Sequence, residues 1–177
     1  ANDPESKTAY HIIATNLIAI APIYSDLYRN STPRGLVISG YKNVVINNFT
    51  LIGDPEYDYQ GHPVIAIQYR ARNVALNNIS MRNFKKAGVD IKVFGGENHA
   101  DYVQISNVSI QDSAPLAIQV GPGLRKVSVE NIHASGKDRK YGLLIDKSSQ
   151  TQIGQVTAKG FAIPIGFSGK QVNTESY

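Results

Sequence analysis

The chain has 177 residues, of which 18% are charged, and its formal net charge is +4. This length suits a single domain with a buried core, and so small an excess of basic residues does not indicate nucleic-acid binding. The absence of cysteine excludes disulfides, thiolate metal sites and cysteine nucleophiles. No apolar run approaches the roughly 18 residues that a membrane-spanning helix needs, so we expect no membrane insertion. We predict one domain over residues 1–177, either complete or excised from a longer protein.

One short motif recurs six times along the chain. In residues 44–51 it reads Val-Val-Ile-Asn-Asn-Phe-Thr-Leu. Apolar residues alternate before Asn48, and the alternation slips by one position after it, which a straight strand would not tolerate. A sharp bend at Asn48 would return both halves to one core, and asparagine accepts the left-handed backbone that such a bend needs. The equivalent positions are Asn16, Asn48, Asn78, Asn107, Asn131 and Gln155.

A further short strand is expected beside each motif. The candidates are residues 36–38, 65–67, 89–93, 116–120, 143–146 and 163–167. Three strands per coil, joined by short corners, give an all-β fold: a right-handed parallel β-helix of about six coils, with the asparagines stacked as an inner ladder. A sandwich would not repeat one motif at this spacing, and the chain shows no helical periodicity that a leucine-rich horseshoe or a doubly wound sheet would require.

The segment from Gly35 to Gly53 resembles the coils of the pectin-lyase-like superfamily of right-handed β-helices, and the resemblance covers residues 12–167. It implies the fold, and it implies a substrate that lies along the outer surface of one parallel sheet. It does not single out an activity, because that superfamily includes lyases, hydrolases, epimerases, phage tailspikes and structural proteins. The paired acids of polygalacturonase-like hydrolases and the Asp-Pro-His-Asp signature of alginate epimerases are both absent.

The outward faces of the short strands provide the candidate catalytic site. Asp90 and Lys92 lie two residues apart in one strand, so we expect both to point outward. Asp90 is expected in a column with Ala66, and Lys92 in the next column, with Asp146 two coils away. In this hypothesis Lys92 is the base or charge stabiliser, and Asp90 and Asp146 position the substrate. The expected substrate-binding residues around them are Gln68, Tyr69, Arg70, Arg72, His99 and Gln119.

A competing interpretation needs no site at all, because outward sheet positions in any solenoid are polar and neighbouring opposite charges form ordinary solvated pairs. A second candidate feature is the loop from Gly53 to His62, where Asp54, Glu56 and Asp58 alternate and could bind calcium through oxygen ligands. An exposed acidic loop explains the same residues, and we expect no other cofactor or metal. A third feature is basic: Arg82, Lys85, Lys86, Lys137, Arg139 and Lys140 form either an edge for an anionic polymer or a charged edge that keeps the sheet soluble.

Two hypotheses for the function remain open. The first is a carbohydrate-active β-helix, lyase-like or hydrolase-like, that acts on or binds an acidic polysaccharide. The alternative is a non-catalytic polysaccharide-binding or structural module of a secreted or phage surface protein. Either hypothesis places the protein outside the cytoplasm, as a secreted, periplasmic or virion-surface protein. Further domains or a homo-oligomer would cover the exposed ends of the solenoid.

Overall fold

The structure, a computed structural model, describes residues 10–20, 35–59, 61–96 and 100–169. These residues form parallel β-strands and no helix, so none of them offers a helix that is long and apolar enough to span a membrane. The strands are β1 (Tyr10–Ile20), β2 (Leu36–Ser39), β3 (Lys42–Ile52), β4 (Pro63–Gln68), β5 (Arg72–Arg82), β6 (Val89–Val93), β7 (Asp101–Gln111), β8 (Leu116–Val120), β9 (Val127–Asp146), β10 (Thr151–Ile153) and β11 (Val156–Ser168).

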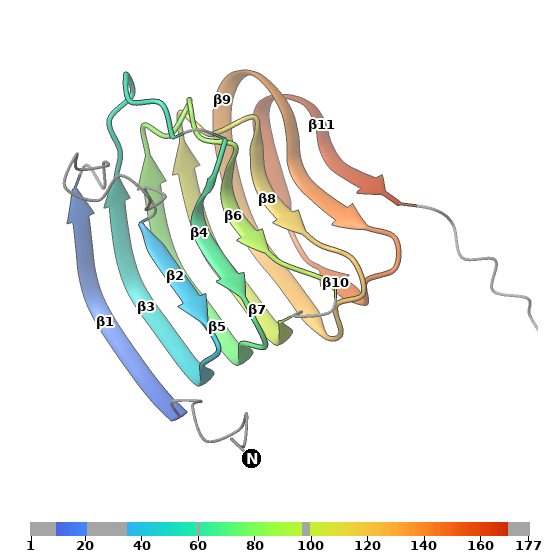
Figure 1. The fold of residues 1–177 in the computed structure, drawn as a ribbon. Helices are drawn as coiled ribbons and strands as arrows, with labels where there is room; N and C mark the ends of the chain where they lie inside the picture. Colours follow the sequence, from blue (N-terminus) through green and yellow to red (C-terminus); the bar gives the residue numbers. More distant parts are fainter. Residues whose placement is uncertain (1–9, 21–34, 60, 97–99, 170–177) are drawn as a thin grey trace, which may run out of the picture.

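The strands wind into a β-solenoid of about four turns (Figure 1). One face carries the long strands in the order β1, β3, β5, β7 and β9, and the other carries β2, β4, β6 and β8. The long strand β9 joins the two faces, because its first half pairs with β7 and its second half with β8. The expected all-β parallel solenoid is therefore confirmed, while the expected six coils of three strands are not seen. Each repeat contributes one long bent strand and one short strand, since the hydrogen-bonded ladder continues through the bend.

The bend itself forms as the motif predicts. Asn48, Asn78 and Asn107 have positive φ angles of 57°, 54° and 54°. Side chains on both sides of this left-handed residue then turn to the same interior, so Ile46 and Phe49 are both buried. The phase slip in the sequence is the signature of this bend.

Stacked columns of apolar side chains form the core. Each coil pairs with the next in register, for example Ile46 with Leu76 and Leu76 with Ile105. These three side chains are at most 3% exposed. Burying a side chain of this size contributes about 1.5–3 kcal/mol, so the long strands are held in place mainly by their own inner columns.

Candidate binding groove

The ladder of asparagines lies on the outside of the solenoid. Asn48, Asn78 and Asn107 are exposed, so the expectation of an inner ladder is wrong. The amides nevertheless stack as expected: Nδ2 of Asn48 donates to Oδ1 of Asn16 (3.1 Å), and Nδ2 of Asn78 donates to Oδ1 of Asn48 (3.1 Å). Further along, Nδ2 of Asn131 donates to Oδ1 of Asn107 (2.6 Å). The amide groups thus form a polar row on an outer face, within which Asn107 donates to Asn77 rather than to Asn78.

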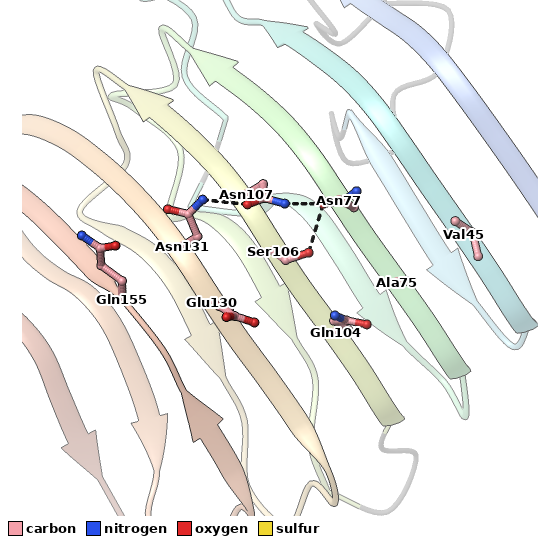
Figure 2. Close-up of a pocket in the computed structure, with 9 residues that line it drawn as sticks. All are labelled: Val45, Ala75, Asn77, Gln104, Ser106, Asn107, Glu130, Asn131 and Gln155. Atoms are coloured by element: carbon pink, nitrogen blue, oxygen red, sulfur yellow. Dashed lines mark hydrogen bonds between the residues drawn. The ribbon is translucent and has the colours of Figure 1, made fainter.

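A second polar column runs beside this row. It holds Asn47, Asn77, Ser106 and Glu130, which pair with one another in that order on successive strands. The two columns are cross-linked, because Oδ1 of Asn77 accepts hydrogen bonds from Nδ2 of Asn107 (2.8 Å) and from the hydroxyl of Ser106 (3.1 Å). Figure 2 shows these bonds along the bend of the long strands.

A groove of about 770 Å³ lies over these columns and over a third one, formed by Val45, Ala75 and Gln104. Its lining is amide-rich, with one hydroxyl, one carboxylate and small apolar patches, and consists of Val45, Ala75, Asn77, Gln104, Ser106, Asn107, Glu130, Asn131 and Gln155 (Figure 2). Amide groups both donate and accept hydrogen bonds, as hydroxyl groups do. A row of them over apolar patches therefore matches a hydroxyl-rich chain such as a polysaccharide.

Asp90 does not lie on an exposed face. Its side chain is fully buried, so the expectation that it points to solvent is wrong. The turn that follows β7 covers it: Asp90 Oδ2 shares a hydrogen bond with the Ser113 hydroxyl and accepts one from the Ala114 amide (3.1 Å). Burial raises the pKa of Asp90 to about 8, although those two hydrogen bonds and the charge of Arg139 act in the opposite direction.

Lys92 is partly exposed on β6, and its neighbours differ from those expected. It pairs with Ala66 on one side and with Gln119 on the other. Gln119 is therefore a neighbour, as predicted, whereas Gln68 pairs with Ser39 instead. The Lys92 ammonium lies 4.5 Å from the centre of the Phe94 ring, and partial burial lowers the pKa of Lys92.

Asp146 does not share the Lys92 column. It pairs with Ser168, at the end of β9, while Gln119 pairs with Leu144. One carboxylate oxygen of Asp146 accepts hydrogen bonds from the amide (3.0 Å) and the hydroxyl (2.6 Å) of Ser148, so this side chain closes the turn after β9. The three predicted catalytic residues thus sit in a buried pocket, on an open sheet face and in a turn.

Three of the predicted substrate-binding residues, Tyr69, Arg70 and Arg72, occupy the corner between β4 and β5. Tyr69 and Arg70 are exposed and have positive φ angles of 49° and 63°. Arg72 is exposed at the start of β5 and pairs with Asp101. His99 falls outside the described residues.

The acidic loop that could bind calcium is attached to the neighbouring coil. Glu56 forms ion pairs with Lys85 (3.0 Å) and Lys86 (3.2 Å), and these two cations lower its pKa. Oδ1 of Asp54 accepts a hydrogen bond from the Glu56 amide (2.9 Å), which folds the loop back on itself. In the described part of the chain, no cluster of three or more His, Cys, Asp or Glu side chains could hold a metal ion.

The predicted basic edge has two parts that meet. Arg139 reaches from β9 to the earlier coil, where its Nη1 donates to the carbonyl oxygen of Lys85 (3.5 Å). Beside it, a hollow of about 810 Å³ is lined by Pro115, Gly136, Lys137, Asp138, Arg139, Lys140, Gly160, Phe161 and Ala162. A local irregularity makes room for the hollow, since β9 has more residues than β11 between the pairs Ser135–Lys159 and Arg139–Phe161.

Sequence reasoning missed the amide groove. The signal was present in the fourth motif position, where polar residues precede the bend in each of the central coils. The motif predicts a role for the bend residue alone and none for Asn47, Asn77 or Glu130. Side chains alternate between inward and outward up to the left-handed residue, so the residue just before the bend points outward. The alternation of the motif therefore predicts the column of Asn47, Asn77, Ser106 and Glu130.

Comparisons with known proteins agree with the solenoid, although no family model matches the chain. The chain is 43% identical over 168 residues to a putative phage-related protein, YobO, of Bacillus subtilis (strain 168), which covers 95% of the chain and 21% of that protein. It is 32% identical over 176 residues to the pre-neck appendage protein of Bacillus phage phi29, which covers 98% of the chain and 20% of that protein.

A solved structure has the same shape. The crystal structure of the pre-mature bacteriophage phi29 gene product 12 matches with a TM-score of 0.84 and 30% identity, over 97% of this chain and 23% of that one. The chain thus spans about a fifth of the length of the curated relatives it matches. Its homologues include phage pre-neck appendage proteins, and these support a β-helix fold.

Proposed function

We propose that this chain is a non-catalytic β-helix module of a phage appendage protein on the virion surface, and that its amide groove binds polysaccharide. The observation that carries the binding proposal is the outward row of asparagines from Asn16 to Asn131, in which Asn78 and Asn107 are linked through the neighbouring column. Each coil presents one asparagine of the stacked ladder. A long polysaccharide that lies along the solenoid would therefore meet the same polar contacts at each coil. The likeness to pre-neck appendage proteins supports the virion location.

The arrangement of the acids favours binding over catalysis. Hydrolysis of a glycosidic bond ordinarily uses two carboxyl groups that face the substrate. Asp90 is buried beneath a turn and Asp146 closes another turn, so neither is offered to a ligand on the face of Lys92. Lys92 has Ala66 and Gln119 beside it on the sheet, and neither can exchange a proton as a partner acid would.

Two variants of one strand test the groove. Gln104 and Gln111 are both exposed on β7, and of the two only Gln104 lines the groove. We expect Gln104→Ala to weaken binding of oligosaccharides, measured by isothermal titration calorimetry, and Gln111→Ala to leave the affinity unchanged. Equal affinities of the two variants would place the ligand elsewhere, and unsaturated sugar ends detected by ultraviolet absorbance would establish a lyase instead.

A second candidate function is supported by the cationic hollow. Lys137, Arg139 and Lys140 line it together with the apolar surfaces of Pro115 and Phe161. Such a combination suits an acidic sugar, because the sugar carboxylate would pair with the lysines and the sugar ring would pack against the apolar wall. If this hollow is the site, the double substitution Lys137→Gln and Lys140→Gln will abolish binding of oligogalacturonate and Gln104→Ala will not.

The first coil supports contact with further protein surface. Ile18 of β1 is 71% exposed, whereas Thr50 and Ser80 occupy the same column in the next coils. Ile13 and Ile20 are also exposed, at 79% and 70%. An apolar patch of this kind is typical of an interface, so a further domain or a second copy of the chain would cover it.

A further inference from the structure

The groove carries its charge at one end only. Glu130 lies at the end of the column formed by Asn77 and Ser106, and it is the single charged residue in the lining. Its side chain lies over Gly154, where a Cβ atom would come within 2.8 Å of the Glu130 Cγ. The glycine therefore leaves room for the Glu130 side chain, which lies on the side of β9 that faces Ser106 and Gln104 (Figure 2).

No residue that the structure describes neutralises the Glu130 carboxylate. Among the hydrogen bonds and ion pairs of the described residues, none involves the Glu130 side chain. No lysine or arginine lines the groove. A ligand group that enters this end therefore meets an unpaired negative charge.

The amide ladder adds a second negative contribution at the same place. Each ladder amide donates from Nδ2 to an oxygen in the preceding coil, so the amide dipoles point in one direction along the solenoid. The row ends at Asn131, which follows Glu130 in the chain, and the Oδ1 atom of Asn131 accepts a hydrogen bond from the Nε2 atom of His133 (3.1 Å). Aligned hydrogen bonds polarise one another, so the oxygen end of the row carries the larger partial negative charge.

We propose that this end of the groove, at Glu130 and Asn131, binds an ammonium group and thereby makes the groove selective for glycans that bear free amines. A sugar ammonium would donate to the Glu130 carboxylate, while the hydroxyl groups of the sugar bond the amides of the earlier coils. A uronate at the same position would be repelled by that carboxylate. This inference rests on the proposed polysaccharide binding and adds the chemical class of the sugar.

The net charge of the protein distinguishes local selectivity for an amine from nonspecific electrostatic attraction. At +4, the chain as a whole attracts polyanions and repels polycations. Nonspecific attraction would therefore favour oligogalacturonate over an amino sugar. A preference for the amine must come from a local feature that overcomes the net charge.

The experiment compares oligosaccharides of equal length on the intact chain. The probes are chitosan oligosaccharides with free amines, their fully N-acetylated counterparts, and oligogalacturonate, each titrated calorimetrically at low salt. We expect the free amine to bind about threefold to fivefold more tightly than the acetylated form, the range of an exposed ion pair, and the difference to vanish at high salt. Oligogalacturonate will bind the groove more weakly than either.

Two variants of equal charge locate the effect. Glu130→Gln removes the carboxylate and keeps its shape, and Asp112→Asn removes an exposed carboxylate at a turn outside the groove. We expect Glu130→Gln to abolish the preference for the amine over the acetylated probe, and Asp112→Asn to keep the preference. The proposed charge selectivity is wrong if both variants keep the preference for the amine, or if the native chain binds the probes without any preference. In either case the proposal that the groove binds polysaccharide is unaffected. If no probe binds, the binding function fails, and the selectivity with it.

Discussion

The hydroxyl group of Ser113 and the carboxyl group of Asp90 share a hydrogen bond that fastens a corner turn of one coil to a strand of its neighbour. The same hydroxyl lies 3.0 Å from the carbonyl oxygen of Ala114, which can only accept. The single Ser113 hydrogen can therefore serve Ala114 only if Asp90 donates its own proton to the Ser113 oxygen. This geometry agrees with a carboxyl group whose pKa is raised to about 8 by burial.

The first prediction concerns how stability depends on pH. An Asp whose pKa rises from 3.8 to about 8 on folding binds a proton more tightly in the native state. The free energy of unfolding therefore falls as pH rises through this window, by at most about 1.4 kcal/mol per pH unit. Asp90→Asn removes this titration, so urea denaturation at pH 5 and pH 8 will show a smaller difference for the variant. Asp112→Asn is the control, and the same slope in the native chain and in Asp90→Asn would show that Asp90 is ionised at neutral pH.

The second prediction separates the two contributions of a ladder asparagine. Asn78 combines a φ of 54° with a side-chain bond to Asn48. Asn78→Ala loses the bond and places a Cβ residue without a polar group in the left-handed region, while Asn78→Gly loses only the bond and adds chain entropy. We expect the alanine variant to unfold with a free energy about 1 kcal/mol lower than the glycine variant. Thermal melting of the two variants measures this, and a more stable alanine variant would contradict the role of the bend.

The third prediction tests the packing of the loop after β3. Tyr59 is 1% exposed, and its hydroxyl accepts a hydrogen bond from the Asp54 amide (3.0 Å). Tyr59→Phe leaves that amide without this partner, which lowers the free energy of unfolding by about 1–3 kcal/mol. Tyr41→Phe is the matched control, since Tyr41 is exposed, and chemical denaturation of both variants gives the comparison. An equal effect of the two changes would mean that water replaces the Tyr59 hydroxyl.

The fold followed from the sequence because one motif encodes both the strand and its bend. The alternation before Asn48 and the slipped alternation after it allow one arrangement that buries both halves. The direction of the amide did not follow from the pattern. Whether a left-handed residue turns its side chain inward or outward depends on the backbone on both sides of it, and the apolar pattern constrains only the neighbours of the asparagine.

The expected columns of the candidate site differ from the observed ones by a register shift. The sequence comparison aligned Asp90 with Ala66, whereas the structure pairs Ala66 with Lys92. A shift of two residues keeps every apolar side chain on the same face, so alternation alone cannot distinguish the two registers. The cover over Asp90 comes from Ser113 and Ala114, 23 and 24 residues away in the chain, and local sequence carries no sign of it.

The bent strands have a constant length, which keeps the asparagines of successive coils in register. β1, β3, β5 and β7 each have 11 residues, while the corners between them vary, so changes in chain length fall outside the ladder. Successive amides are then separated by the spacing of neighbouring strands, about 4.8 Å. A polymer whose repeating unit advances by a similar step can present one unit to each coil. A polymer with a different step falls out of phase after a few coils. If the groove binds a polymer as proposed, its affinity will therefore depend on the repeat length of the polymer as well as on its chemistry.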